Sequence, residues 1–309
     1  MAGTDSSVAG RTGILDLLLV WALFGIVAIE VFVTYARTPV QELYHVRTGG
    51  LEQGAGRALA FVGFPVDLAV LAVLPFAVDR LSRRAGAIAV AAALAVTAAV
   101  LWPGALDESG IEAAPARLLA ALGVTIALAL TIRAWRARGA GSLGREPGDR
   151  VRLVVAVVLL AIGLPWMAAD LGLSLDRVPL LRSVYITDQF ASQPSRAGLH
   201  PAVHDGHHHG MDGVLLAWAA LLVSRTLGRL RHTRVRSATT IYVGFLLVYG
   251  TANAIQDAWL EQVVKRGWST YELPTMLVPS ASVAWLAVVL GTGAAALLLS
   301  GARNVSGRR

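Results

Sequence analysis

Cysteine is missing from this 309-residue chain, and charged residues are scarce. Without thiols the protein forms no disulfide and offers a metal ion no thiolate, so any bound metal must be held by nitrogen and oxygen donors. Only 15% of the residues are charged, against roughly 25% in ordinary soluble domains, while 55% are hydrophobic. This composition excludes an ordinary soluble domain and indicates a membrane protein.

Familiar nucleotide-binding and hydrolase motifs are missing as well. The sequence contains no GxxxxGK[ST] phosphate loop, no HExxH zinc motif and no GxSxG nucleophile elbow. The formal net charge is +7, but the arginines cluster at the ends of apolar segments, where they set membrane topology. We therefore expect neither nucleotide-driven chemistry nor a nucleic-acid partner.

Apolar segments near ~20 residues recur along the chain, which is the length that crosses a ~30 Å hydrocarbon core as a helix. The sequence predicts an all-α, polytopic integral membrane protein surrounded by membrane lipids. The Gly- and Arg-rich loop 136–150 predicts a cytoplasmic connection between two possible four-helix halves, 1–135 and 151–309. About eight spans are predicted, at residues 14–35, 58–78, 85–104, 117–134, 153–173, 212–229, 238–258 and 280–301.

Basic residues are distributed unevenly between the two ends of these spans. Cytoplasmic loops retain Lys and Arg, so the side that carries more of them is the inner side. If the N-terminus is inside, 18 of the 27 basic residues fall in inner segments and the other nine in outer loops. We therefore predict that both termini are cytoplasmic, that the chain lies in the cell membrane, and that residues 200–210 face outward.

Five of the seven histidines fall within that outward segment, HPAVHDGHHHG. His200 and His204 are four residues apart, and Pro201 suits the first turn of a short helix, so both imidazoles are predicted to face one ion. Gly206 allows the chain to bend and bring in further ligands from the adjacent run. The candidate metal ligands are His200, His204, His207, His208 and, from the QELYH segment of the first outer loop, Glu42 and His45.

Such donors suit zinc, iron, copper or manganese, and the sequence does not select among these divalent ions. Another interpretation is that the histidines form a solvent-facing loop without a catalytic role.

Acidic residues within the predicted spans concentrate toward the same side. An ionisable group in a span is costly and usually faces a bundle interior. Asn253, Asp257 and Glu261 recur every four residues, which predicts one polar stripe along a helix face. Three further acids, predicted to lie in the outer parts of their spans, complete this polar membrane site: Glu30, Asp67 and Asp170.

These features favour a metal-dependent membrane enzyme, either a hydrolase or an oxidoreductase. The metal would polarise a substrate oxygen or lower the pKa of a bound water toward ~7, and Asp257 or Glu261 would act as the general base. The expected substrate is a lipid, a lipid-linked envelope precursor or a small hydrophobic molecule. Two alternatives stay open: a proton- or cation-coupled transporter with the histidines as its outer vestibule, and a non-catalytic assembly subunit.

Overall fold

The structure, a computed structural model, is a bundle of long apolar helices. It describes residues 14–37, 49–79, 82–101, 115–138, 144–170, 178–179, 182, 190–193, 196–201 and 209–306. Six helical segments are long and apolar enough to cross a membrane, which gives the chain the character of a multi-pass membrane protein. These six are Ile14–Arg37, Leu51–Phe76, Arg83–Val100, Arg117–Arg136, Thr233–Val264 and Val283–Ser300.

The predicted helical class is therefore confirmed. The helices are α1 (Ile14–Arg37), α2 (Leu51–Phe61), α3 (Asp67–Val78), α4 (Arg83–Val100), α5 (Pro115–Arg138), α6 (Asp149–Asp170), α8 (His209–Ser224), α9 (Thr233–Trp259) and α10 (Val283–Ser306). The predicted spans 153–173 and 212–229 overlap two further helices, α6 and α8, which are not among these six, and the count of eight stays a prediction.

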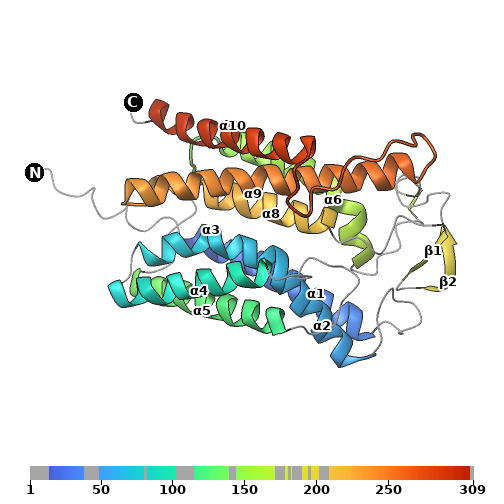
Figure 1. The fold of residues 1–309 in the computed structure, drawn as a ribbon, viewed down its shortest axis with the longest axis horizontal. Coiled ribbons are helices and arrows are strands. Elements are labelled where there is room, and N and C mark those ends of the chain that lie inside the picture. The colour runs from blue at the N-terminus through green and yellow to red at the C-terminus, as the bar shows by residue number, and fades with distance from the viewer. Residues whose placement is uncertain are drawn as a thin grey trace, which may run out of the picture.

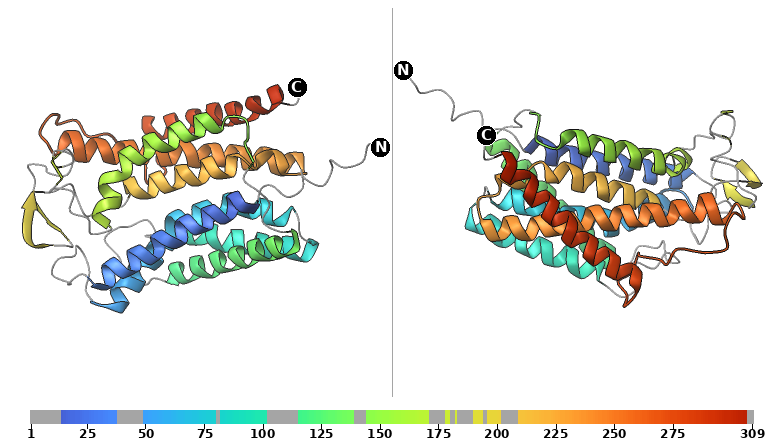
Figure 2. Two further views of the ribbon diagram at one scale, coloured as in Figure 1. Left: turned by 180° about the vertical axis from the view of Figure 1, so that it is seen from behind. Right: turned by 90° about the horizontal axis from the view of Figure 1, so that it is seen from above.

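The helices form two layers (Figure 1). One layer contains α1 to α5, and the other contains α6, α8, α9 and α10. Figure 2 shows the same separation from behind, and from above it shows α10 crossing obliquely over α9. Helix α8 packs against α1, α3, α6 and α9, so it is enclosed by both layers. Exposed apolar side chains instead lie on α4, α6 and α10, among them Leu94, Val158 and Leu298.

The span formed by α2 and α3 is interrupted by a π-helical turn, η2 (Val62–Val66). Pro65 lies inside this turn and has no backbone N–H, so the preceding helical turn lacks one hydrogen bond. Asp67, the first residue of α3, follows directly. A second π-turn, η5 (Leu260–Val264), extends α9.

Helices α8 and α9 cross at two glycines. A Cβ atom built on Gly213 would lie 2.4 Å from the carbonyl oxygen of Gly250, and a Cβ atom on Gly250 would lie 2.4 Å from that of Gly213. Only hydrogen atoms fit at such a crossing, because any larger side chain would overlap the facing backbone. The two backbones therefore approach as closely as their main chains allow.

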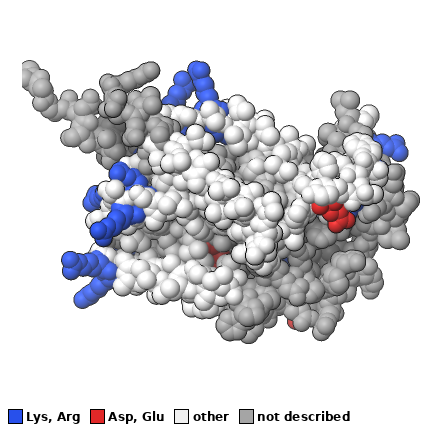
Figure 3. All heavy atoms as spheres, turned by 45° about the horizontal axis from the view of Figure 1, so that its top comes forward, with Lys and Arg blue, Asp and Glu red and all other residues white. Residues whose placement is uncertain are grey.

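Basic side chains gather at one end of the bundle, which we call the arginine-rich end (Figure 3). There α8 connects to α9 through the turn that contains η4 (Leu227–Arg229). Buried and half-buried ion pairs join this turn to α1 and to the segment before α6. We call this group the arginine cluster: Asp16, Glu146, Asp149, Arg152, Arg225 and Arg229.

Arg225 is the centre of the arginine cluster. Its guanidinium lies 2.8 Å from the Asp16 carboxylate and 2.5 Å from that of Asp149. Burial opposes the charged form of Asp149, but the Glu146 N–H and the Arg225 guanidinium hold the pKa of this carboxyl below its ordinary value. The cluster thus ties α1 in one layer to α6 and α8 in the other.

A short antiparallel ribbon is the one pair of strands in the part of the chain that the structure describes. Strand β1 (Phe190–Gln193) pairs with β2 (Arg196–Pro201), and His200 lies opposite Ala191. The predicted helix beginning at His200 and Pro201 is therefore wrong at that point, because both residues are extended. In the strand, the backbone of this segment forms hydrogen bonds with β1. A short helix would form few hydrogen bonds within itself, so it is the less stable choice here.

Candidate functional site

The candidate site lies where α8 begins, at the end of the bundle opposite the arginine-rich end. Helix α8 has 16 residues, whereas α9 has 27 and continues into η5. The chain of α9 and η5 extends seven residues beyond Asp257, or about 10 Å of helix. Because Asp257 contacts the first turn of α8, that turn is recessed below the end of its neighbour.

Asp257 holds the beginning of α8 directly. The backbone N–H of Gly210 donates to Asp257 Oδ2 at 2.8 Å, and the Asp257 side chain is 2% exposed. The first N–H groups of a helix have no partner within the helix, and the helix dipole favours a negative charge beside them. A residue from α9 thus caps α8 from outside that helix.

Further polar side chains surround this contact. Asp212 lies in the first turn of α8, is buried, and interacts electrostatically with the Tyr249 hydroxyl of α9. Tyr249 in turn donates its hydroxyl proton to the carbonyl of Leu277 at 2.8 Å. These contacts join α8, α9 and the segment before α10 at one level of the bundle.

Asn253 lies one helical turn from both Tyr249 and Asp257. Its amide nitrogen donates to the Tyr249 carbonyl at 2.9 Å, and its Cβ lies against Gly213 of α8. The side chain is 3% exposed, and within the described part of the chain its Oδ1 accepts no hydrogen bond. This amide oxygen is therefore a candidate acceptor for a ligand at the site.

Glu261 lies in η5, four residues after Asp257. Its carboxylate pairs with the ammonium of Lys265 at 2.6 Å, and only 1% of Glu261 is exposed. Asn253, Asp257 and Glu261 are all buried, and Asn253 and Asp257 both lie against α8, whereas the extension of one polar stripe to Glu261 stays a prediction. The capping bond of Asp257 and the ion pair of Glu261 are contacts that the sequence did not reveal.

The other predicted acids do not join this group. Glu30 is half-buried on α1 and accepts a hydrogen bond from the Thr34 hydroxyl at 3.0 Å. Asp67 is fully buried near Tyr242, which precedes Asp257 on α9 by 15 residues, or about 22 Å. Asp67 therefore lies much deeper than the candidate site. Asp170 is the last residue of α6, and its side chain is outside the described part.

Most of the predicted metal ligands cannot be placed. Glu42, His45, His204, His207 and His208 lie outside the described residues, and only the backbone of His200 is described. Within the ranges that the structure describes, no three His, Asp or Glu side chains come together as a metal site. The metal centre thus stays a prediction.

Asp212 and Tyr249 are two polar residues of the site that the sequence did not predict. Their signal was the spacing along α9, because Tyr249 lies four residues before Asn253 and so extends the same polar face toward the arginine-rich end. The pairing with α8 carries no such signal in the sequence.

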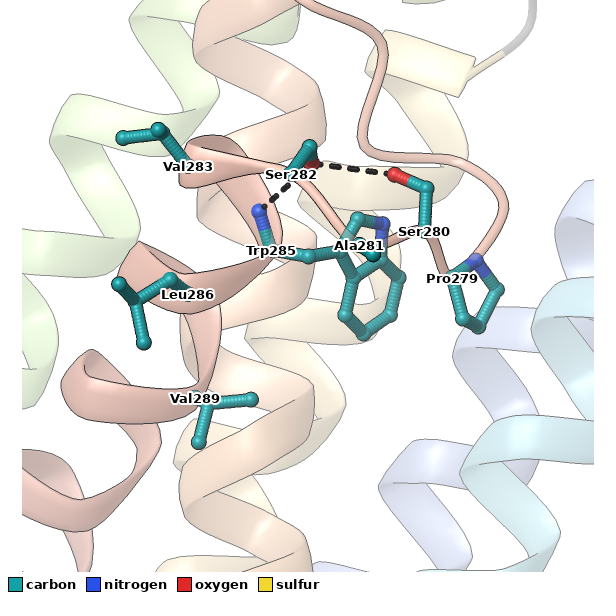
Figure 4. Close-up of a pocket in the computed structure, with 8 residues that line it drawn as sticks. All are labelled: Pro279, Ser280, Ala281, Ser282, Val283, Trp285, Leu286 and Val289. Atoms are coloured by element: carbon teal, nitrogen blue, oxygen red, sulfur yellow. Dashed lines mark hydrogen bonds between the residues drawn. The ribbon is translucent and has the colours of Figure 1, made fainter.

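A shallow groove at the beginning of α10 is chemically different from the candidate site (Figure 4). The Ser282 hydroxyl oxygen accepts a hydrogen bond from the backbone N–H of Trp285 at 3.2 Å. It also accepts one from the Ser280 hydroxyl at 3.0 Å. The remaining lining, from Pro279 to Val289, is mainly apolar and has no titratable side chain. This groove offers neither an acid nor a base for catalysis.

No protein-family model, curated protein or solved structure matches this chain. Its function must therefore be inferred from the chemistry of its own residues.

Proposed function

We propose that the chain is a membrane-embedded enzyme whose centre is the buried polar group at the beginning of α8. The observation that carries the proposal is the concentration of Asp212, Asn253 and Asp257 around a recessed helix terminus inside an otherwise apolar bundle. Buried acids in a membrane protein are costly and usually serve a function. The expected substrate is a lipid, a lipid-linked envelope precursor or a small hydrophobic molecule that enters from the outer leaflet.

A divalent metal is part of this proposal. Two buried carboxylates lie beside Gly210: Asp257 accepts its N–H, and Asp212 follows it by two residues. The histidine run 207–209 directly precedes Gly210 in the chain. Such oxygen and nitrogen donors fit zinc, iron, copper or manganese. The metal would supply Lewis-acid polarisation or an activated water. Asp257 and Glu261 are the candidate proton acceptors, in addition to the contacts that each makes in the fold.

The first test is elemental analysis of the purified full-length protein. We expect roughly one tightly held metal ion per chain in the wild type, because preorganised ligands retain a metal through washing. The double variant His204→Ala, His208→Ala should lose it. His232→Ala is the matched control, since this histidine precedes α9 at the arginine-rich end and should leave the metal content unchanged. Equal metal in the double variant and the wild type would contradict the metal centre.

The reaction itself is tested by comparing membrane-lipid composition in cells that express the wild type and Asp257→Asn. An enzyme predicts a lipid species that changes with the wild type only. The transporter alternative predicts instead an altered proton or cation flux in vesicles with unchanged lipids. If neither the wild type nor Asp257→Asn changes the lipid composition or the ion flux, the non-catalytic assembly role is favoured.

A further inference from the structure

Asp67 is an isolated acid in the middle of the bundle. It is 0% exposed, and neither carboxylate oxygen has a hydrogen-bond partner in the described part of the chain. It begins α3 directly after the π-turn that contains Pro65. Its neighbours along the chain, Val66, Ala69 and Val70, are apolar and buried as well.

Few titratable groups face the segment of η2 and α3 from the helices packed against it. Helix α4 has no titratable residue after Arg84, and α5 has only Arg117 in the part that precedes Arg133. From Gly210 onward α8 has only Asp212. Between Arg236 and Asp257, α9 has Tyr242 and Tyr249, and the segment's own helix α2 carries Glu52 and Arg57.

Tyr242 is the neighbour that interacts with Asp67. The Tyr242 hydroxyl donates its hydrogen bond to the carbonyl of Leu68 at 2.8 Å, so it does not donate to the Asp67 carboxylate. Arg117 packs against Gly63, one helical turn before Asp67, through the aliphatic part of its side chain. No described contact therefore supplies the positive charge that an ionised Asp67 would need.

An ionised carboxylate without a partner is very unfavourable in a low-dielectric interior, whereas a neutral carboxylic acid is far easier to bury. A metal cation would stabilise the ionised form only with several oxygen ligands around it. Among the described residues, no cluster of three His, Asp or Glu side chains is present that could hold a metal here. The proton is the one ligand that neutralises this carboxylate without further donors.

We propose that Asp67 is a buried proton-binding site, occupied as the neutral carboxylic acid between α3 and α9. The site lies about 22 Å along α9 from Asp257 and is separate from the proposed enzymatic centre. It does not depend on the proposed function. Loss of the proton would leave a charge facing apolar side chains, so proton occupancy keeps α3 packed against α9.

Labelling with dicyclohexylcarbodiimide tests this site in the purified full-length protein. The reagent adds to a neutral carboxylic acid: the acid proton moves to one carbodiimide nitrogen, the oxygen bonds to the central carbon, and an acyl shift leaves a stable N-acylurea. At about pH 7, where exposed carboxyls are ionised, we expect modification of the peptide that contains Asp67. Asp67→Asn should abolish that modification, whereas the control Asp79→Asn, at the partly exposed end of the same helix, should retain it.

Infrared spectroscopy gives a second measurement that does not depend on reagent access. The wild-type spectrum minus that of Asp67→Asn should contain the carbonyl band of a neutral acid at about pH 7. Carboxylate bands in their place would overturn the proposal. Disappearance of the acid band when sodium ions are added at constant pH would also overturn it, because the site would then bind a cation. If Asp67→Asn does not accumulate, Asp67→Glu serves instead, because it keeps a carboxylic acid at this position. Its carbonyl band should differ in frequency from that of the wild type, and this difference assigns the band to residue 67.

Discussion

At the scale of single residues, Asp257 carries the most weight, because it belongs to both the fold and the candidate chemistry. Its carboxylate accepts the Gly210 N–H at a buried helix terminus, so it stabilises the position of α8 whatever else it does. A side chain with two duties requires variants that separate them. Asparagine keeps an oxygen that can accept the N–H bond but lacks the charge, and alanine lacks both.

We expect Asp257→Ala to destabilise the folded protein by roughly 1–3 kcal/mol, because a buried N–H loses its partner. Asp257→Asn should retain most of the stability and lose the proposed activity. Thermal unfolding in detergent measures the first effect, with Gln256→Ala as the control because that half-buried neighbour does not cap α8. Equal stability of Asp257→Ala and the control would show that the capping bond contributes little.

At the scale of elements, the pairing of α8 and α9 places the candidate site. The glycine crossing brings the two backbones together, and Asn253 and Asp257 then face the first turn of α8. Helices in a membrane gain little from excluding water from each other, so close packing of small residues matters more there than in soluble bundles. A methyl group at the crossing would push apart the helices that form the site.

Gly213→Ala and Gly250→Ala should therefore each lower stability by roughly 1–3 kcal/mol through overpacking. Gly25→Ala and Gly293→Ala, in α1 and α10, are matched controls, since a Cβ atom there meets nothing within 4 Å. These controls should be neutral or slightly stabilising, because alanine favours helix over glycine. The measurement is again thermal unfolding, and similar losses in controls and crossing variants would refute this explanation of the packing.

At the scale of the whole molecule, charge separates the two ends of the bundle. Basic side chains gather at one end of the bundle (Figure 3), where the arginine cluster lies, and the buried polar group lies at the beginning of α8, toward the opposite end. Positive charge is retained in the cytoplasm, so the arginine-rich end is expected inside and the candidate site outside. Because the chain has no cysteine, a single introduced cysteine is its only thiol, and the labelling of that thiol reports on which side of the membrane it lies.

We expect an impermeant maleimide to label Thr270→Cys in intact cells, because this exposed residue precedes α10 at the candidate-site end. Gly144→Cys, exposed beside the arginine cluster, should react only after the cells are permeabilised. Blocking with a permeant thiol reagent before the assay is the control for both variants. The opposite labelling pattern would place the candidate site in the cytoplasm and remove the outer-leaflet proposal.

The sequence by itself determined the membrane class, the basic bias and the buried polar face of α9, because these follow from composition and from helical periodicity along one segment. Only the tertiary structure decided which helix covers that face, since the Gly210–Asp257 bond joins residues 47 positions apart. The isolation of Asp67 was likewise decided by the helices packed around it. His200 lies in a strand rather than the predicted helix because pairing with β1 supplies its hydrogen bonds, and a local pattern cannot encode a partner that the chain reaches only on folding.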